Sequence, residues 1–385
     1  MGMSKNKTVR INISSGRAIE EKAKFSRTIR VNDLVLQSGT TAINRSGKVL
    51  GSTVGEQVKA VMSIAEKSMA AADGNILNTF RARLYVKGKN NIRGAEDAFI
   101  AHFKGNPPAT TCFEISGLTR PQQLVEIELE ALTKPPLPEF FENKKKAAQK
   151  AGALKLASRI FIPGYITKGE NMTAKISDAG RFLHKTLTGF ELKNSDIVSI
   201  RFYCSNIEDL WRSPIKLAEL CGLENPTVVF IGVPTENTLI IEAEATANPT
   251  TKKEKNIHPV LAPFSESLCV DSDIYLSSIY PTGTSGEMLA PENWSEQRSI
   301  STANLKTVLE RANSNLNDVA VRRYFTLHSV SETNYDEGPP WFESTRPSAL
   351  GCRVNHHALK GALISLDSHA IRGAGENIVK KNVDE

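Results

Sequence analysis

Hydrophobic and polar positions follow one another along this chain in an order that occurs three times. In each copy, an apolar strand with a turn of small residues precedes a helix, a strand, a second helix, a strand that begins with proline, and a closing strand. The period of roughly 120 residues is that of a small domain and is too long for a solenoid unit. The small-residue turns are LVLQSGT (34–40), RIFIPGY (159–165) and IYLSSIY (274–280).

Apolar residues at helical spacing predict a long helix in each copy, over 54–72, 172–187 and 295–312. A shorter second helix is expected over 94–103. The closing strands alternate in polarity, as expected of strands that bury one face. These strands are VEIELEAL (125–132), IIEAEATA (240–247) and LISLDSHA (363–370), and the proline-led strands begin at Pro108, Pro226 and Pro347.

The repeated order predicts an α+β fold. Each copy supplies one sheet with two helices on a single face, so the other face needs cover. Three sheets packed around an axis would cover one another and make the chain an intramolecular pseudo-trimer, with barrel-like sheets inside and helices outside. The alternative, three separate domains joined like beads, would expose three apolar sheet faces. The expected domains are 1–135, 150–248 and 259–375, with linkers over 134–150 and 248–259.

Composition narrows the class of protein. With 385 residues, 40% apolar and 23% charged, the chain has the composition of a soluble globular protein. The net charge of +6 lies partly in solvated lysine runs, so no nucleic-acid partner is expected. No apolar run predicts a membrane span or a signal peptide, so no membrane partner is expected. Five scattered cysteines without a CxxC pair indicate reduced thiols in a cytoplasmic protein, and no spacing predicts a metal site.

The first copy carries five motifs in a recognisable order: SGTTA (38–42), GEQV (55–58), RLYV (83–86), PATTCFEISGL (108–118) and LVEIELEA (124–131). In this it resembles the Rid (reactive intermediate deaminase, YjgF/YER057c/UK114) family. The second and third copies resemble the family in element order and a few anchors, as diverged domains would. The resemblance implies three chorismate-mutase-like domains, with ligand sites in clefts between neighbouring units.

The resemblance also implies an activity. Members of the family hydrolyse imines and enamines derived from amino acids, without a metal or an organic cofactor. A Pro-Ala-Arg motif supplies an arginine that clamps the substrate carboxylate, and a glutamate on the last strand helps to position water. A bidentate arginine suits a planar carboxylate, and imine hydrolysis needs little beyond positioned water and a proton donor or acceptor.

This sequence departs from the motif because the arginine is missing in every copy. Threonine, valine and alanine cannot form a charged clamp, so poor hydrolysis of imines from simple amino acids is expected unless Arg346, just before the third proline-led strand, replaces it. The motif reads Pro108-Ala109-Thr110, Pro226-Thr227-Val228 and Pro347-Ser348-Ala349 in the three copies.

The glutamate is better retained. Glu126 and Glu242 are interpreted as matching positions, and Ser365 takes that place in the third copy, so unequal clefts are expected. Glu126 and Glu242 are the candidate catalytic residues, and backbone amides near Gly39 or Gly164 are candidates to bind an oxygen. The candidate substrate-binding residues are Ser38, Gly39, Thr110, Cys112, Gly164, Ser277 and Arg346.

These features favour a cofactor-independent small-molecule enzyme, a hydrolase, deaminase or lyase that acts on an imine, enamine or related C–N electrophile in specialised metabolism. Two alternatives remain open. One is chorismatase-like lyase or hydrolase chemistry at an inter-domain cleft, and the other is a non-catalytic protein that binds a metabolite or a partner. Loss of the clamp arginine favours the alternatives, whereas retention of glutamates favours an enzyme. Further homo-oligomerisation is left open.

Overall fold

The computed structural model describes residues 8–104, 106–133, 152–247, 254–330 and 342–383. The first segment of the chain contains two helices that cover its sheet and one short extra helix. Its elements are β1 (Arg10–Ser14), α1 (Ala18–Ala23), β2 (Thr28–Val31), β3 (Leu34–Thr41), α2 (Val54–Ala71), β4 (Thr79–Lys87), α3 (Ile92–His102), β5 (Ala109–Ile115) and β6 (Val125–Leu132).

The second and third segments follow a similar order, except that the described residues of the third contain one α-helix and not the predicted second helix. The second contains β7 (Leu154–Leu156), β8 (Arg159–Ile166), α5 (Met172–Thr188), β9 (Ile197–Cys204), α6 (Ile207–Trp211), α7 (Pro214–Cys221), β10 (Thr227–Gly232) and β11 (Leu239–Thr246). The third contains β12 (Glu254–Ile257), β13 (Ser265–Val270), β14 (Asp273–Leu276), α8 (Trp294–Arg311), β15 (Val319–Leu327), β16 (Ser348–Val354), β17 (Ile364–Ile371) and β18 (Ile378–Asn382). Single 3₁₀ turns precede β4, β9 and β15, at Ile76–Asn78, Asn194–Asp196 and Leu316–Asp318.

Strand order within the segments confirms the α+β prediction. The central strands run β3-β6-β4-β5, β8-β11-β9-β10 and β14-β17-β15-β16, the same order each time. The predicted long helices are confirmed as α2, α5 and α8, and the shorter helix as α3. The C-terminal strand was not predicted. It pairs in parallel with β1, so the end of the chain completes the sheet of the first segment.

The linker predictions are only partly covered by the described residues. The first linker, 134–150, lies outside them, and so do residues 248–253 of the second. The remainder of the second is not simply a linker, because β12 pairs antiparallel with β13 there.

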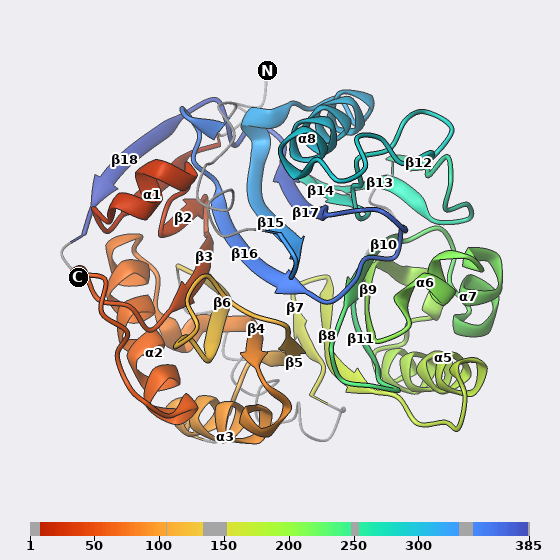
Figure 1. Ribbon diagram of the computed structural model, residues 1–385, viewed down its shortest axis with the longest axis horizontal. Helices are drawn as coiled ribbons and strands as arrows, with labels where there is room; N and C mark the ends of the chain where they lie inside the picture. The colour runs from red at the N-terminus through yellow and green to blue at the C-terminus, as the bar shows by residue number, and fades with distance from the viewer. Residues whose placement is uncertain (1–7, 105, 134–151, 248–253, 331–341, 384–385) are drawn as a thin grey trace, which may run out of the picture.

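The three segments contact one another in a closed order. The proline-led strand β5 packs beside β8 of the second segment, β10 pairs with β13 of the third at Thr227 and Ser265, and β16 packs beside β3 of the first. Figure 1 shows the result: the helices lie at the rim of a disc, and the strands of all three segments face its centre. Every segment therefore has a junction with each of the other two.

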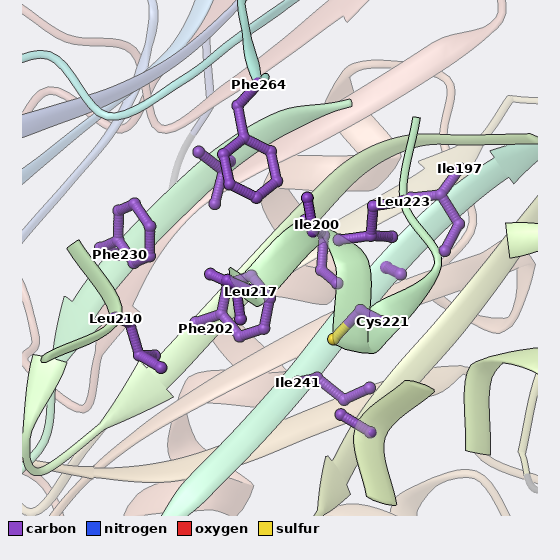
Figure 2. Close-up of a cluster of buried hydrophobic side chains, with 14 of the residues drawn as sticks. Ile197, Ile200, Phe202, Leu210, Leu217, Cys221, Leu223, Phe230, Ile241 and Phe264 are labelled. Atoms are coloured by element: carbon purple, nitrogen blue, oxygen red, sulfur yellow. The ribbon is translucent and has the colours of Figure 1, made fainter. Parts of the chain in front are cut away.

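Each apolar core lies between a sheet and its outer helices. Figure 2 shows that of the second segment, where Phe202 and Phe230 of adjacent strands meet Leu217 from α7. Helix α5 packs closely on α7 because it carries glycine at the crossing: a Cβ on Gly180 would lie 2.3 Å from the carbonyl oxygen of Leu220. The helices of the described residues include none with the length and apolar content needed to cross a membrane.

Candidate active site

The closing strand β6 directs three glutamates away from the helices. Val125 and Ile127 lie in the apolar core beneath α2. Because strand side chains alternate, Glu126, Glu128 and Glu130 point to the opposite face, toward the other segments. This confirms the alternation of polarity predicted for the closing strand.

Strand register shows which carboxylates correspond in the three segments. The prediction that Glu242 matches Glu126 is wrong, because Glu242 takes the place of Glu128 and Ile240 takes the place of Glu126. Both closing strands carry glutamates two residues apart, so the sequence pattern looks the same when one strand is aligned two residues further along the other. The register pairs are Glu128 with Arg83, Glu242 with Arg201 and Asp367 with Arg323, and then Glu126 with Tyr85, Ile240 with Tyr203 and Ser365 with Phe325.

Six of these charged groups form a ring at the junction of the segments, which we call the central ion-pair ring. In it, each arginine donates to the carboxylate of another segment, so the order of contacts is cyclic. Nε of Arg83 lies 2.9 Å from Oε1 of Glu242, Nε of Arg323 lies 2.8 Å from Oε2 of Glu128, and Nη2 of Arg201 lies 3.2 Å from Oδ1 of Asp367.

The ring fixes the charge state of Glu242. Burial alone would raise the pKa of its carboxyl, but the charge and hydrogen bonds of Arg83, with the charge of Arg201, outweigh burial and lower the pKa to about 2. Tyr203 also donates its hydroxyl to this carboxylate at 2.9 Å. A carboxylate held ionised in this way is a poor proton carrier, so the geometry does not support the catalytic role predicted for Glu242.

Glu126 has very different surroundings. It is 7% exposed and lines a cavity of about 290 Å³ between the first and third segments. Burial, and then the charge of Glu128, raise the pKa of its carboxyl to about 8, although Arg27 acts in the opposite direction. Among the described side chains none is hydrogen-bonded to Glu126. It can therefore hold a proton near neutral pH and exchange it with a ligand.

We call this space the Glu126 cavity. Gly39 of β3 makes room for the carboxyl, since a Cβ there would lie 2.4 Å from Oε1 of Glu126. Ala349 and Gly351 of β16 form the facing wall. Glu126 is the one carboxylate among the described residues that line the cavity, and the lining is otherwise strongly cationic, which favours an anionic ligand. The arginines that line it are Arg17, Arg27, Arg120, Arg298, Arg322 and Arg353.

The two predicted serines hold segments together. The buried hydroxyl of Ser38 donates to the carbonyl oxygen of Ser26 at 2.6 Å and accepts the N–H of Ala349 at 2.9 Å. Ser277 makes the same pair of bonds, to Ser265 at 2.6 Å and from Val228 at 2.8 Å. Both hydroxyls therefore tie a proline-led strand to the next segment, at the position where the motif would place its arginine.

Three other candidates lie at the junction of β5 and β8, away from the Glu126 cavity. The hydroxyl of Thr110 donates to the carbonyl oxygen of Pro108 at 2.8 Å. Cys112 packs against the core of the first segment, where burial and then the charge of Glu96 raise the pKa of its thiol well above the usual value. A Cβ on Gly164 would lie 2.8 Å from Cγ2 of Thr111, so the strands are in close contact there.

The prediction for Arg346 is not supported, since its guanidinium is engaged at the surface. It forms ion pairs with Glu21 and with Glu343, the latter at 3.1 Å. It is absent from the lining of the Glu126 cavity as far as the described residues go.

Sequence reasoning missed Arg322. It pairs in register with Ala349, directly beside the position of the missing motif arginine, whereas the corresponding residues of the other segments are Ala82 and Ile200. The side chain is 2% exposed, donates from Nη2 to the carbonyl oxygen of Lys24 at 2.9 Å, and has a buried Nε without a hydrogen-bond partner. The signal was present in VAVRRYFTL, where an arginine occupies a position that the strand alternation assigns to the helix face.

The described residues contain no group of three or more His, Cys, Asp or Glu side chains placed to hold a metal ion.

The raised pKa of Glu126 predicts a pH dependence of stability. Between pH 4.5 and about 8 the unfolded chain has lost this proton while the folded protein keeps it, so the free energy of unfolding falls as pH rises, by at most about 1.4 kcal/mol per unit. Buried His258 and His357, whose pKa values are lowered to about 4 and about 3, act in the opposite sense below pH 6.5. Urea unfolding between pH 6.5 and 8 should therefore show the slope in the wild type and lack it in Glu126→Gln; equal slopes would contradict the assignment.

Comparison with known proteins finds relatives of the first segment. Residues 15–133 match the family model described as Endoribonuclease L-PSP. The chain is 25% identical over 126 residues to the RutC family protein UK114 of Drosophila melanogaster, covering 32% of this chain and 91% of the relative. It is 18% identical over 110 residues to Protein HMF1 of Saccharomyces cerevisiae, covering 29% and 83%.

A solved structure of a YjgF/YER057c/UK114 family member from Mycobacterium tuberculosis is 28% identical and covers 32% of this chain and 98% of its own, with a TM-score of 0.29. The motifs of the first copy predicted the same family, and the family model and the curated relatives match that copy along nearly its whole length. Residues 15–133 of the chain therefore match the Rid (YjgF/YER057c/UK114) family.

Proposed function

We propose that this chain is an intramolecular trimer of Rid-type domains, and that its Glu126 cavity hydrolyses an imine, enamine or related C–N electrophile that carries an anionic group. The observation that carries the proposal is a carboxyl of raised pKa in a cavity whose other charged lining residues, among those described, are arginines. The family match supports the broader statement, a deaminase-type role on a small molecule. A cavity of about 290 Å³ suits a ligand of that size.

The closed order of segment contacts supports the trimeric arrangement. Three junctions of equivalent strands and a cyclic ring of ion pairs are what a three-fold assembly of one domain would produce. The domains would be 1–135, 150–248 and 259–375, with the C-terminal strand β18 added to the first sheet.

Only one of the three junctions retains the carboxylate. By register, Ile240 holds the place of Glu126 at the junction of β5 and β8, and Ser365 holds it where β10 meets the third segment. Isoleucine cannot transfer a proton, and a serine needs a partner to act as a base. A fused chain can keep one competent cleft while the other two diverge.

The proposed reaction uses a single proton carrier. Glu126 in its protonated form donates to the imine nitrogen, which makes the imine carbon more electrophilic. A water molecule then adds to that carbon, and the Glu126 carboxylate takes a proton from the adding water. Transfer of this proton to nitrogen makes the amine a leaving group. As the C–N bond breaks, the Glu126 carboxylate takes the proton of the carbinolamine hydroxyl, so that an amine and a carbonyl compound leave and Glu126 is again protonated. Each step needs positioning more than strong acid or base strength.

Arg322 is the residue best placed to bind the anionic group. It lies beside Ala349, its Nε is unpartnered, and its carbonyl bonds to the loop at Lys24 hold the guanidinium in place. Stacking of its guanidinium on the ring of Phe342, 4.9 Å away, further limits its movement. Such a preorganised guanidinium would replace the arginine that the motif lacks.

This role can be tested by moving the guanidinium from position 322 to the motif position. Arg322→Met should lower kcat/KM for imines generated from amino acids by an amino-acid oxidase by roughly 10- to 150-fold, the value of a charged hydrogen bond of about 1.5–3 kcal/mol. Adding Ala349→Arg should restore part of that loss, because it returns a guanidinium to the motif position.

An uncharged imine provides the internal control, since its turnover should change little in either variant. Thermal unfolding of both variants separates a folding defect from a binding defect. If Ala349→Arg rescues nothing while the protein stays folded, or if the uncharged imine loses as much activity, Arg322 does not bind the anionic group.

A further inference from the structure

A second and larger cavity, of about 430 Å³, lies between the second and third segments and takes no part in the chemistry proposed above. We call it the α6–α8 cavity. Its walls come from Trp211 at the end of α6, from residues 258–260, from the turn 277–284 and from the side of α8 that carries Asn304 and Thr307. Its volume lies within the usual range of small-molecule sites.

The charges of this cavity differ from those of the Glu126 cavity. Because Ser26 and Ser265 accept the same bond from the two junction serines, Arg27 and Glu266 occupy equivalent positions. Glu266 is paired with Arg311, whose Nη1 lies 2.7 Å from its carboxylate. Among the described lining residues, Glu266 is the one acidic side chain and Arg311 the one Lys or Arg, so the wall has no net charge.

Aromatic rings form one side of the α6–α8 cavity. The ring of Trp211 meets that of Tyr280 edge to face, with centroids 5.1 Å apart and an interplanar angle of 78°. The ring of His258 lies at 6.4 Å and 85° from Trp211. Rings held in such positions are suited to stacking and edge contacts with another flat ring.

Two polar groups of the lining have unused hydrogen-bonding capacity. Nδ1 of His258 accepts the N–H groups of Val260 at 3.1 Å and Leu261 at 2.9 Å, and burial lowers the pKa of this histidine to about 4. It is therefore neutral, with its proton on Nε2 as a donor. Nδ2 of Asn304 donates to the carbonyl oxygens of Tyr280 and Thr282, both at 2.9 Å, which leaves Oδ1 as an acceptor among the described residues.

We propose that the α6–α8 cavity binds an uncharged planar aromatic molecule that carries one hydrogen-bond acceptor and one donor, such as an aromatic amide or a heteroaromatic base. The ring of the ligand packs against the aromatic wall. The imidazole N–H of His258 donates to its acceptor, and the Asn304 side-chain oxygen accepts from its donor. The paired charges at Glu266 and Arg311 offer nothing to balance a carboxylate, so an anion of the same shape binds elsewhere. The proposal does not depend on what the Glu126 cavity catalyses.

The test uses two probes of nearly equal shape, 4-fluorobenzamide and 4-fluorobenzoate, observed by fluorine NMR with the full chain. Thr307→Trp places a large side chain at the cavity from an exposed position on α8, so it should fold normally. Lys306→Trp, also exposed on α8 but away from the cavity, is the matched control.

We expect 4-fluorobenzamide to bind the wild type, Lys306→Trp and Glu126→Gln with equal affinity. Its affinity for Thr307→Trp should be at least fivefold lower. We expect binding of 4-fluorobenzoate to be unchanged by Thr307→Trp. The proposal is overturned if the amide shows no binding at millimolar concentration or if Thr307→Trp does not weaken its binding. It is also overturned if the affinities of both probes fall equally in that variant.

Discussion

Replacing Glu126 by Gln is expected to lower kcat for imine hydrolysis by about a hundredfold or more, with a much smaller change in KM. Glutamine keeps the shape of the side chain but has no transferable proton, and the Glu126 cavity has no second carboxylate among its described lining residues. In the wild type, kcat should also change with the ionisation of a group near pH 8, because burial and Glu128 raise the pKa of Glu126 to about that value. The variant should lose this feature of the pH profile.

The matched control is Ser365→Ala, at the position that corresponds to Glu126 in the third segment. It should leave kcat unchanged, since no carboxyl function remains at that junction. Full activity in Glu126→Gln would sink the carboxylate mechanism. If no imine is turned over but a small anion still binds in the Glu126 cavity, the protein is a binding protein, the alternative that the missing motif arginine favours.

Replacing Glu242 by Gln is expected to destabilise the fold by about 3–5 kcal/mol, the cost of removing one partner from a buried ion pair. The change leaves the guanidinium of Arg83, which is 2% exposed, without the carboxylate that it contacts at 2.9 Å in another segment. Urea unfolding at pH 7 measures the loss directly. Activity should survive in the folded fraction, because Glu242 lies outside the lining of the Glu126 cavity.

Glu310→Gln serves as the surface control. Glu310 and Lys306 form an exposed pair at 3.7 Å on α8, and such pairs contribute roughly 0–1 kcal/mol. A double change, Arg83→Met with Glu242→Leu, should recover much of the stability, because it removes both charges together. If Glu242→Gln costs no more than the surface control, the central ion-pair ring is not what holds the segments together.

The sequence alone determined the local structure of this protein. Apolar spacing located α2, α5 and α8 to within about two residues, since a helix must turn the same side chains toward the core every 3.6 residues. Alternation in the closing strands placed Glu126 and Glu128 on one face for the same kind of reason. The motifs of the first copy were sufficient for the family, because they lie within one domain.

Only the tertiary structure decided which residues meet. The glutamates of β6 and β11 recur every two residues, so sequence could not distinguish Glu242 in the central ion-pair ring from a partner of Glu126; hydrogen-bonded register could. Arg322 became a site residue through pairing with Ala349 on another strand, and Arg346 was removed from the site by a contact with Glu21, 325 positions away. Local periodicity depends on residues that are close together in the sequence, whereas a cleft between segments depends on contacts between residues hundreds of positions apart.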